Sequence, residues 1–209
     1  NASISGGGEN STFSTSLGYL DQTGMTIYSD YKRYNFRVNS SYKKGIFSLS
    51  ENIAITHRDK TPTTAFNISL PTLPIYDSEG RFFSGGGDYY INPEDGKAQN
   101  KIAPLHYTDR YNKVTDIIGA ITAQLDLWDG LKYKFSFSGN YSNSHNYTHT
   151  PEYYTKWNED GTPDQDYGSP KNSISESRGE EFTYTIDNLL TYNKTFSGHS
   201  IDALVGTSW

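Results

Sequence analysis

Residues 131–141 read LKYKFSFSGNY, and this stretch decides the fold class. Apolar residues and a glycine stand at the odd positions, and Lys, Ser and Asn stand between them. A β-strand turns successive side chains to opposite faces, so this alternation predicts one apolar and one polar face. Similar patterns recur at 11–20, 34–42, 46–56, 117–127, 182–192 and 200–209. We therefore predict about seven strands, several of them longer than the typical strand of about 5–6 residues.

The connections between these strands alternate in length. Residues 43–45, 128–130 and 196–199 form tight links, whereas roughly 55 residues separate His57 from Tyr111 and roughly 30 separate Thr150 from Gly179. Long structureless loops are uncommon in a compact soluble domain. Short periplasmic turns and long extracellular loops are typical of outer-membrane barrels. The sequence therefore predicts an all-β, antiparallel segment of a transmembrane β-barrel.

Aromatic residues lie near the predicted strand ends, where a membrane barrel carries interfacial girdles. The predicted girdle residues are Tyr34, Tyr42, Trp128, Tyr133, Tyr141, Tyr184 and Tyr192, with Trp209 at the last strand. Residues of the polar face that we expect to line the lumen are Arg37, Asn39, Thr122, Gln124, Lys132, Lys134 and Asp187. Two polar residues, Glu51 and Asn188, interrupt the apolar face, and the sequence offers no reason for Glu51.

Composition excludes several classes of protein. The 209 residues include no Cys, which excludes disulfides and thiolate metal sites. No run approaches the roughly 18 consecutive apolar residues of a spanning helix. The net charge of -6 argues against nucleic acid, because phosphate binding needs a basic footprint. We therefore expect no nucleic-acid partner.

No catalytic constellation is visible, and we expect neither an enzyme nor a cofactor. His145 and His149 are four residues apart and share a strand face, but a metal site needs further ligands. We therefore predict no metal. A glycoside hydrolase fragment would need paired carboxylates at catalytic separation, and no such pairing can be read from the sequence.

Aromatic residues also cluster in the long loops. They are Phe82, Phe83, Tyr89, Tyr90, Tyr153, Tyr154 and Trp157. Such side chains suit sugar rings, peptides or a protein partner, since Tyr and Trp dominate interface hot spots. They equally suit packing of the loops against one another. Both interpretations stay open from the sequence.

Several short segments occur in a telling order. Residues 5–8 read SGGG, 16–22 SLGYLDQ, 31–39 YKRYNFRVN, 73–80 LPIYDSEG and 204–208 LVGTS. In this order they resemble the barrel of the SusC/RagA family of TonB-linked outer-membrane importers from Bacteroidetes. The resemblance runs along nearly the whole chain.

This resemblance implies a function and a set of partners. Such importers take up oligosaccharides or oligopeptides through the outer membrane of a Gram-negative bacterium. A SusD-like surface lipoprotein caps the barrel as a lid, and the TonB complex acts through a plug domain. Complete members are several times longer, with about 22 strands. We therefore expect residues 1–209 to form part of one barrel domain, in contact with lipid, the plug and the remaining strands.

Two rival interpretations are kept. A soluble secreted β-sandwich that binds carbohydrate would bury the aromatic faces between two sheets. A small self-contained barrel would need about eight strands, and the sequence pattern does not reveal an eighth.

Overall fold

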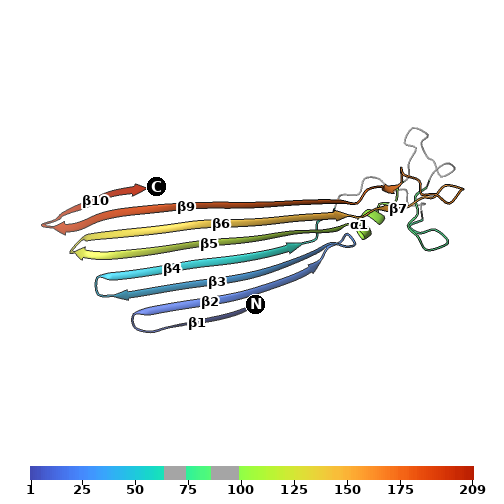
Figure 1. Cartoon of the computed structure of the whole chain (residues 1–209). Coiled ribbons are helices and arrows are strands. Elements are labelled where there is room, and N and C mark those ends of the chain that lie inside the picture. The colour runs from blue at the N-terminus through green and yellow to red at the C-terminus, as the bar shows by residue number, and fades with distance from the viewer. Residues whose placement is uncertain (64–73, 86–98) are drawn as a thin grey trace.

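The computed structural model describes residues 1–63, 74–85 and 99–209, and it is all-β apart from one short helix (Figure 1). Eight strands form one antiparallel sheet in the order β1-β2-β3-β4-β5-β6-β9-β10. These are β1 (Ala2–Gly7), β2 (Ser11–Thr23), β3 (Asp30–Lys44), β4 (Phe47–Lys60), β5 (Asp109–Trp128), β6 (Leu131–Thr150), β9 (Ser173–Phe196) and β10 (His199–Ser208). A second sheet pairs β7 (Tyr153–Tyr154) with β8 (Gly168–Ser169), and α1 spans Ala103–Tyr107. The predicted fold class is confirmed.

The connections divide the sheet into a turn end and a loop end. Residues 8–10, 45–46, 129–130 and 197–198 make the turn end, and three of these turns hold a glycine with positive φ. Residues 24–29, 61–63, 74–85, 99–108 and 151–172 are the described residues of the loop end. Figure 1 shows the two ends at opposite extremes of the long strands. The predicted alternation of short and long connections is confirmed.

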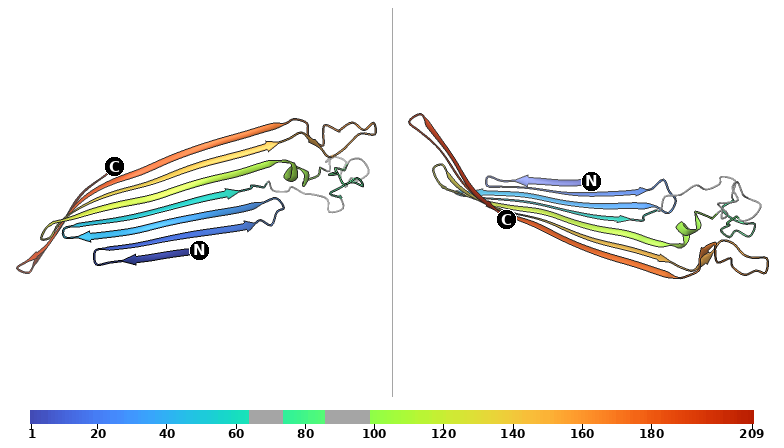
Figure 2. Two further views of the ribbon diagram at one scale, coloured as in Figure 1. Left: turned by 60° about the horizontal axis from the view of Figure 1, so that its bottom comes forward. Right: turned by 90° about the horizontal axis from the view of Figure 1, so that it is seen from above.

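An eighth strand, β1, was not apparent from the sequence. Its residues read ASISGG, so any alternation is limited to the four residues from Ala2 to Ser5. The strand is defined by pairing with β2, from Ala2 opposite Leu17 to Gly7 opposite Thr12. The sheet nevertheless stays open, because β1 and β10 lie at opposite edges (Figure 2). The described residues therefore do not close into a small barrel.

The strands also reach further toward the loop end than the sequence pattern indicates. β9 has 24 residues and begins at Ser173, so the second part of the loop predicted from Thr150 to Gly179 is wrong. Residues 173–181 are polar on both faces apart from Ile174 and Gly179, and alternation gives no signal there. Their strand conformation comes from long-range pairing with β6, where Thr150 lies opposite Ser173.

Burial is concentrated in the loops. Every residue that the structure describes as buried lies in the loop module, which we define as residues 74–85, 99–108 and 151–172. The sheet leaves large apolar side chains exposed, among them Leu17 at 57% and Val205 at 71%. A β-sandwich would cover them with a second sheet, but the second sheet within the described residues is the two-stranded pair of the loop module. The sandwich interpretation is therefore not supported.

The described part of the chain contains one helix, the five-residue α1. None of its helical segments has the length and the apolar character needed to cross a membrane.

Candidate functional site

The apolar residues of neighbouring strands share one face of the sheet. The register places Phe36 opposite Ile55, Ile55 opposite Ile117, Ile117 opposite Tyr141 and Tyr141 opposite Phe182. Directly opposite residues point to the same side of a sheet. The local patterns therefore join into one continuous surface, which we call the apolar face; the other side is the polar face.

Tyrosines mark two levels on the apolar face. The pairs are Tyr34 and Tyr42 on β3, Tyr133 and Tyr141 on β6, and Tyr184 and Tyr192 on β9. Each pair is eight residues apart in the sequence. Eight residues extend about 26 Å along a strand. At the tilt usual for membrane barrels this is about 20 Å along the membrane normal, close to the roughly 25 Å apolar band of such barrels.

The same tyrosines indicate how the strands tilt. The register leads from Tyr34 through His57, Thr115 and Asn143 to Glu180 on β9. Tyr184 stands four residues closer to the turn end of β9 than Glu180 does. The upper tyrosine level therefore shifts by four residues toward the turn end between β3 and β9, over four strand pairings. With a rise of about 3.3 Å per residue and a strand spacing of about 4.8 Å, this drift corresponds to a tilt of about 35°. Outer-membrane barrel strands tilt by roughly 35–45°.

A β-bulge brings Trp128 to the lower level. The register between β5 and β6 shifts between Asp126 and Trp128, so that Trp128 rather than Leu127 lies opposite Leu131. A bulge of this kind redirects a side chain to the other face. Trp128 therefore shares the apolar face near the turn end, 75% exposed. We call the surface between the two tyrosine levels the apolar band.

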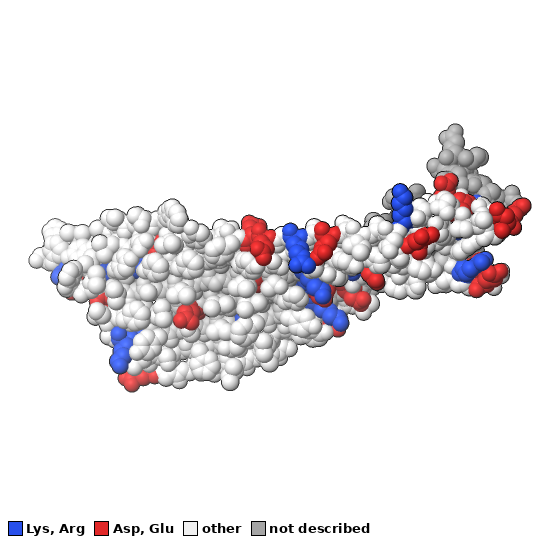
Figure 3. Space-filling model, viewed as in Figure 1, with Lys and Arg blue, Asp and Glu red and all other residues white. Residues whose placement is uncertain are grey.

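Charged side chains replace apolar ones on this face toward the loop end. Lys113 Nζ lies 3.7 Å from Asp59 Oδ2, and His145 Nε2 lies 2.7 Å from Glu176 Oε1. Arg178 also donates to Glu176, and these hydrogen bonds hold the pKa of Glu176 below its usual range. In the view of Figure 3, charged side chains gather over the loop half of the sheet, and few lie over the turn half. The apolar band thus ends at a defined level.

Both polar interruptions of the apolar band have hydrogen-bond partners. Asn188 Oδ1 accepts from the Tyr133 hydroxyl at 2.6 Å. Glu51, half-buried at the centre of the band, accepts from Ser40 Oγ at 3.2 Å on the neighbouring strand. A carboxylate that faces hydrocarbon is costly, and a single hydroxyl only partly offsets that cost.

The polar face carries a network of side-chain hydrogen bonds. Asn52 Nδ2 donates to Asn39 Oδ1 at 2.5 Å, and Asn39 Nδ2 donates to Ser14 Oγ at 3.2 Å. Asp116 accepts from Ser142 Oγ at 2.8 Å and also pairs with Arg58. The residues that we expected to line the lumen, Arg37, Asn39, Thr122, Gln124, Lys132, Lys134 and Asp187, all share this face by register. They form a surface suited to water and polar solutes.

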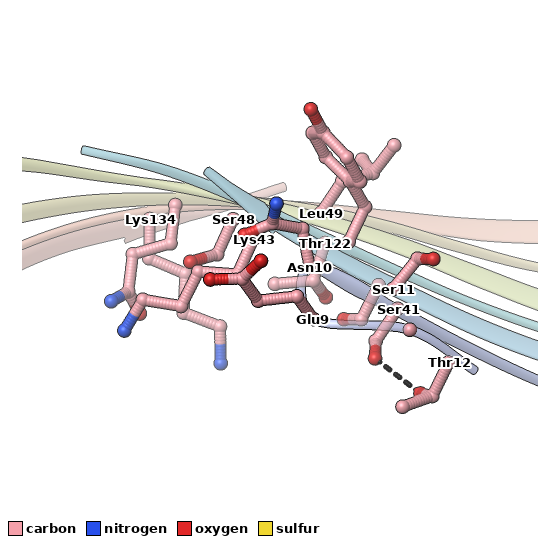
Figure 4. Close-up of a pocket in the computed structure, with 14 residues that line it drawn as sticks. Glu9, Asn10, Ser11, Thr12, Ser41, Lys43, Ser48, Leu49, Thr122 and Lys134 are labelled. Carbon is pink, nitrogen blue, oxygen red and sulfur yellow. Dashed lines mark hydrogen bonds between the residues drawn. The ribbon is translucent and has the colours of Figure 1, made fainter. Parts of the chain in front are cut away.

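A hollow of about 510 Å³ lies on the polar face at the turn end. Figure 4 shows Glu9, Thr12 and Ser41 on one side of the ribbons and Leu49 on the other, as the alternation requires. Ser41 and Thr12 join β3 to β2 through a hydroxyl–hydroxyl bond of 2.6 Å. Polar side chains from five strands and one turn thus line a concave surface.

The loop module is organised around Asn100. Its Nδ2 donates to the carbonyl oxygens of Ile75 (2.8 Å) and Phe83 (2.9 Å), and its Oδ1 accepts from the backbone N–H groups of Ile102 and Ala103. Its own N–H donates to Ser84 Oγ, and this hydroxyl lies 2.6 Å from Thr155 Oγ1. One buried amide therefore connects three loop segments.

Aromatic rings pack beside this network. Phe82 is buried, with ring centroids 4.9 Å from Tyr76, 5.1 Å from His106 and 5.5 Å from Tyr107. Tyr107 stacks on Tyr153 at 4.7 Å. Burial raises the pKa of the Tyr153 hydroxyl. This cluster joins both long loops.

The predicted binding aromatics fall into different settings within the module. Phe82 and Tyr153 belong to the ring cluster, whereas Trp157 lies beneath the Arg81 guanidinium at 4.6 Å and the Tyr154 hydroxyl donates to Glu152. Phe83 is half-buried and its carbonyl accepts from Asn100. Tyr89 and Tyr90 lie outside the described residues. A binding role for these seven aromatics stays a prediction.

Two hairpins of the module share one backbone design. Tyr76 bridges to Phe82 and Trp157 bridges to Pro163, with the same spacing. Gly80 and Gly161 occupy the same position in the two turns, each with φ of 79°. The first hairpin contacts the second where Arg81 stacks on Trp157. The sequence alone did not reveal this likeness, because the two copies differ at most positions.

The potential metal ligands have other partners. His149 Nε2 lies 2.9 Å from Asn172 Oδ1, and His145 bonds to Glu176 as described above. Among the residues that the structure describes, no group of three or more His, Asp or Glu side chains is placed to hold a metal ion.

Comparison with known proteins gives a fold likeness. No protein-family model matches the chain, and no curated protein matches it. Among solved structures, the RagAB peptide transporter matches 99% of this chain at 18% identity with a TM-score of 0.73. The RagAB peptide importer in its 'closed-closed' and 'open-open' states gives a TM-score of 0.74 for each, again at 18% identity. The chain spans 23% of the length of these structures.

This likeness concerns the fold. The open eight-stranded sheet, its long strands and its loop module match one part of a much longer chain.

Proposed function

We propose that this chain forms part of the barrel wall of a TonB-dependent importer in the outer membrane of a Gram-negative bacterium. The observation that carries the proposal is the apolar band, bounded by two tyrosine levels, on a sheet without a buried residue in its described part. In water such a face is an unfavourable exposed apolar surface. In a bilayer it contacts lipid, and the polar face lines the lumen.

The open edges support further strands in the same barrel. Unpaired N–H and C=O groups are not tolerated in hydrocarbon, so β1 and β10 need neighbours there. We propose that strands of the same protein supply them. A plug domain within the lumen and the TonB complex acting on it complete this proposal. The segment itself supplies wall, loops and part of the cavity, and we assign it no catalytic role.

Two observations bear on the class of substrate. The similar structures are described as peptide transporters or importers, which favours oligopeptides for the present chain. The loop module adds exposed polar and aromatic side chains, among them Tyr76 at 49%, which suit oligosaccharides as well. We propose import of one of these oligomers, with a SusD-like lipoprotein as the lid over the loop end.

Uptake by cells tests the proposal. Cells that produce the intact protein are supplied with a fluorescent oligopeptide or oligosaccharide, with and without a protonophore that removes the energy source of TonB. We expect uptake of one class, loss of uptake with the protonophore, and co-purification of a lipoprotein with the tagged protein. Energy-independent passage of both classes would indicate a passive channel and contradict the proposal.

A further inference from the structure

The six arginines of the chain, all within the described residues, differ in their partners. Three of them, Arg58, Arg81 and Arg178, pair with carboxylates. Arg33 and Arg37 are exposed, so their donors are accessible to water. Arg110 is different, because it is half-buried on β5 and forms no ion pair among the described residues.

Two donor atoms of Arg110 are unsatisfied. Its Nε and Nη2 are buried, and neither has a hydrogen-bond partner in the described part of the chain. Burial lowers the pKa of the Arg110 guanidinium, since desolvation disfavours its charge. A buried charged donor without a partner costs more than an ordinary lost hydrogen bond. Such a group in a native protein calls for an explanation, and a bound ligand is one.

The position of Arg110 places it at the mouth of the lumen. It lies opposite Thr148 on β6, at an even position that shares the polar face with Asp116 and Thr122. It stands seven residues toward the loop end from Ile117, which is about 23 Å along the strand. Arg110 is therefore outside the apolar band and close to the loop module, whose segment 99–108 ends immediately before β5.

Among the strand residues that the structure describes, those nearest to Arg110 on the polar face include a second cation and no carboxylate. Lys60 lies opposite Asn112, diagonal to Arg110. Diagonal neighbours on adjacent strands are about 7–8 Å apart. The residues of this face nearest to Arg110 on β5, β6 and β9 are hydroxyls and amides, namely Asn112, Asn146, Thr148, Ser175 and Ser177. Val114 and Arg58, which pairs with Asp116, follow further toward the turn end. Asp116 and Glu181 are the first carboxylates along the strands, in one row six residues below.

On the apolar face, the charged side chains near the loop end of the strands form pairs. Lys113 pairs with Asp59, and Glu176 accepts from both His145 and Arg178. The unpaired cations therefore occur only on the lumenal side of the described upper strands. This asymmetry indicates a ligand in the lumen rather than a stabilising ion pair.

We infer that Arg110, assisted by Lys60, binds a carboxylate group of the transported oligomer at the mouth of the lumen. The guanidinium offers a fork of N–H donors that matches a carboxylate in a two-point contact. Neighbouring amides and hydroxyls supply further hydrogen bonds. The carboxylate belongs either to a peptide or to an acidic sugar. The inference rests on the proposed import function and narrows its substrates to acidic oligomers.

Binding to the intact protein in detergent tests the inference. The peptide probes are an N-acetylated eight-residue Ala/Ser peptide with a free C-terminal carboxylate and its C-terminal amide. The sugar probes are an oligogalacturonate and its methyl ester. We expect one of the two acids to bind roughly 10- to 100-fold more tightly than its neutral counterpart, the range for hydrogen bonds to a charged group. Equal affinity of acid and neutral forms in both pairs, or no binding of any probe, would overturn the inference.

Variants assign the effect to the arginine. Arg110→Gln is expected to lose the preference for the acid while it keeps its affinity for the neutral probe, and Lys60→Gln to reduce the preference partly. Arg37→Gln is the matched control, because it removes an exposed arginine from the same face. A preference that survives in Arg110→Gln would contradict the inference.

Stability separates binding from a structural role. The buried donors of Arg110 are unpaired, so Arg110→Gln is expected to leave the unfolding midpoint of the ligand-free protein unchanged or raised. A lower midpoint together with weaker binding of acid and neutral probes alike would indicate a structural arginine and overturn the inference. Binding that depends on Arg110 without cellular uptake would contradict the proposed function but retain the site. Cellular uptake without a preference for the acidic probes would support the proposed function and contradict the arginine site.

Discussion

The sheet and the loop module are stabilised in different ways. The sheet consists of long paired strands whose apolar side chains stay exposed, including Ile4 at 65% and Phe182 at 60%. The loop module buries its few apolar side chains around hydrogen-bonded polar groups, with Ser84 at 1% exposure and Asn100 at 7%. The stability of the sheet therefore requires an external environment that covers its apolar side chains, whereas the loop module is stabilised by its own internal contacts. This contrast is expected where one part contacts lipid and the other contacts water.

A charge in the apolar band gives the largest expected effect. Ile121 lies in the middle of the band, opposite Glu51 and Phe137. Ile121→Lys, made in a Glu51→Gln background so that the new ammonium has no carboxylate opposite it, is expected to destabilise the intact protein in lipid by about 2–4 kcal/mol relative to Glu51→Gln alone, the cost of a lysine at the midplane of a barrel. Urea titration in lipid vesicles, followed by the shift of the folded band on gels, measures this effect.

The neighbouring residue is the control for that variant. Thr122 is on the polar face, with its hydroxyl 3.2 Å from Ser136 Oγ. Thr122→Lys is expected to change stability by less than about 1 kcal/mol, because the new charge stays in water. Equal losses in the two variants would show that the two faces do not differ in their environment.

Loss of the central amide of the loop module gives the next largest effect. Asn100→Ala leaves two carbonyls and two N–H groups without their partner, at a cost of about 1–3 kcal/mol for the module. We expect faster proteolysis of residues 74–85 and 151–172 with unchanged protection of the sheet. Asn140→Ala, at an exposed position on β6, is the control. Simultaneous loss of the sheet would show that the two regions are not independent.

Removal of the carboxylate within the apolar band has a smaller effect with the opposite sign. Glu51→Leu exchanges a group held by one hydrogen bond for an apolar side chain. We expect the protein in lipid to gain about 1–2 kcal/mol if this surface contacts hydrocarbon. The same titration measures the change. A loss of stability would indicate that Glu51 contacts a protein partner rather than lipid.

The charged groups above the band give the smallest effect. Hydrogen bonds from Arg178 and His145 lower the pKa of Glu176. A carboxylate with a lowered pKa stabilises the folded state above its unfolded pKa, and this contribution is lost as the pH falls through the folded value. Hydrogen exchange at residues 173–180, corrected for intrinsic rates, is therefore expected to increase slightly below pH 4. Glu176→Gln is expected to abolish this dependence, and a persistent dependence would assign it to another group.

The sequence predicts the apolar face well, because alternation is a local property. Each strand between residues 34 and 192 shows it without knowledge of its neighbours, and the tight turns then restrict the register. β1 and the upper part of β9 were missed, since β1 alternates over only four residues, the upper part of β9 has almost no apolar side chains, and pairing with a neighbouring strand defines both. The bulge that brings Trp128 to the apolar face was likewise invisible, because it depends on a register shift against Leu131.

The loop module and the arginine site were beyond sequence reasoning for a related reason. Asn100, Ser84 and Thr155 are distant in the chain, and their hydrogen bonds depend on how the loops fold. The aromatic residues of the loops were recognised, but the stacking of Tyr153 on Tyr107 was not. Arg110 is distinguished by buried donor atoms that have no partner and by the lack of an ion pair. This can be recognised only when the positions of both neighbouring strands are known.

The measurement that tests the central claim most directly is a scan of β5 with single spin labels. The chain contains no Cys, so labels attached to cysteine substitutions at positions 113 to 127 report individual sites once any other cysteine of the intact protein is replaced. In lipid bilayers we predict high oxygen accessibility at 117, 119, 121, 123 and 125, and high accessibility to a water-soluble relaxant at 118, 120, 122 and 124. Water accessibility is expected to return on the odd positions at 115 and 113. Uniform water accessibility, or protection of the odd positions from both relaxants, would contradict the placement of this sheet in the wall of a membrane barrel.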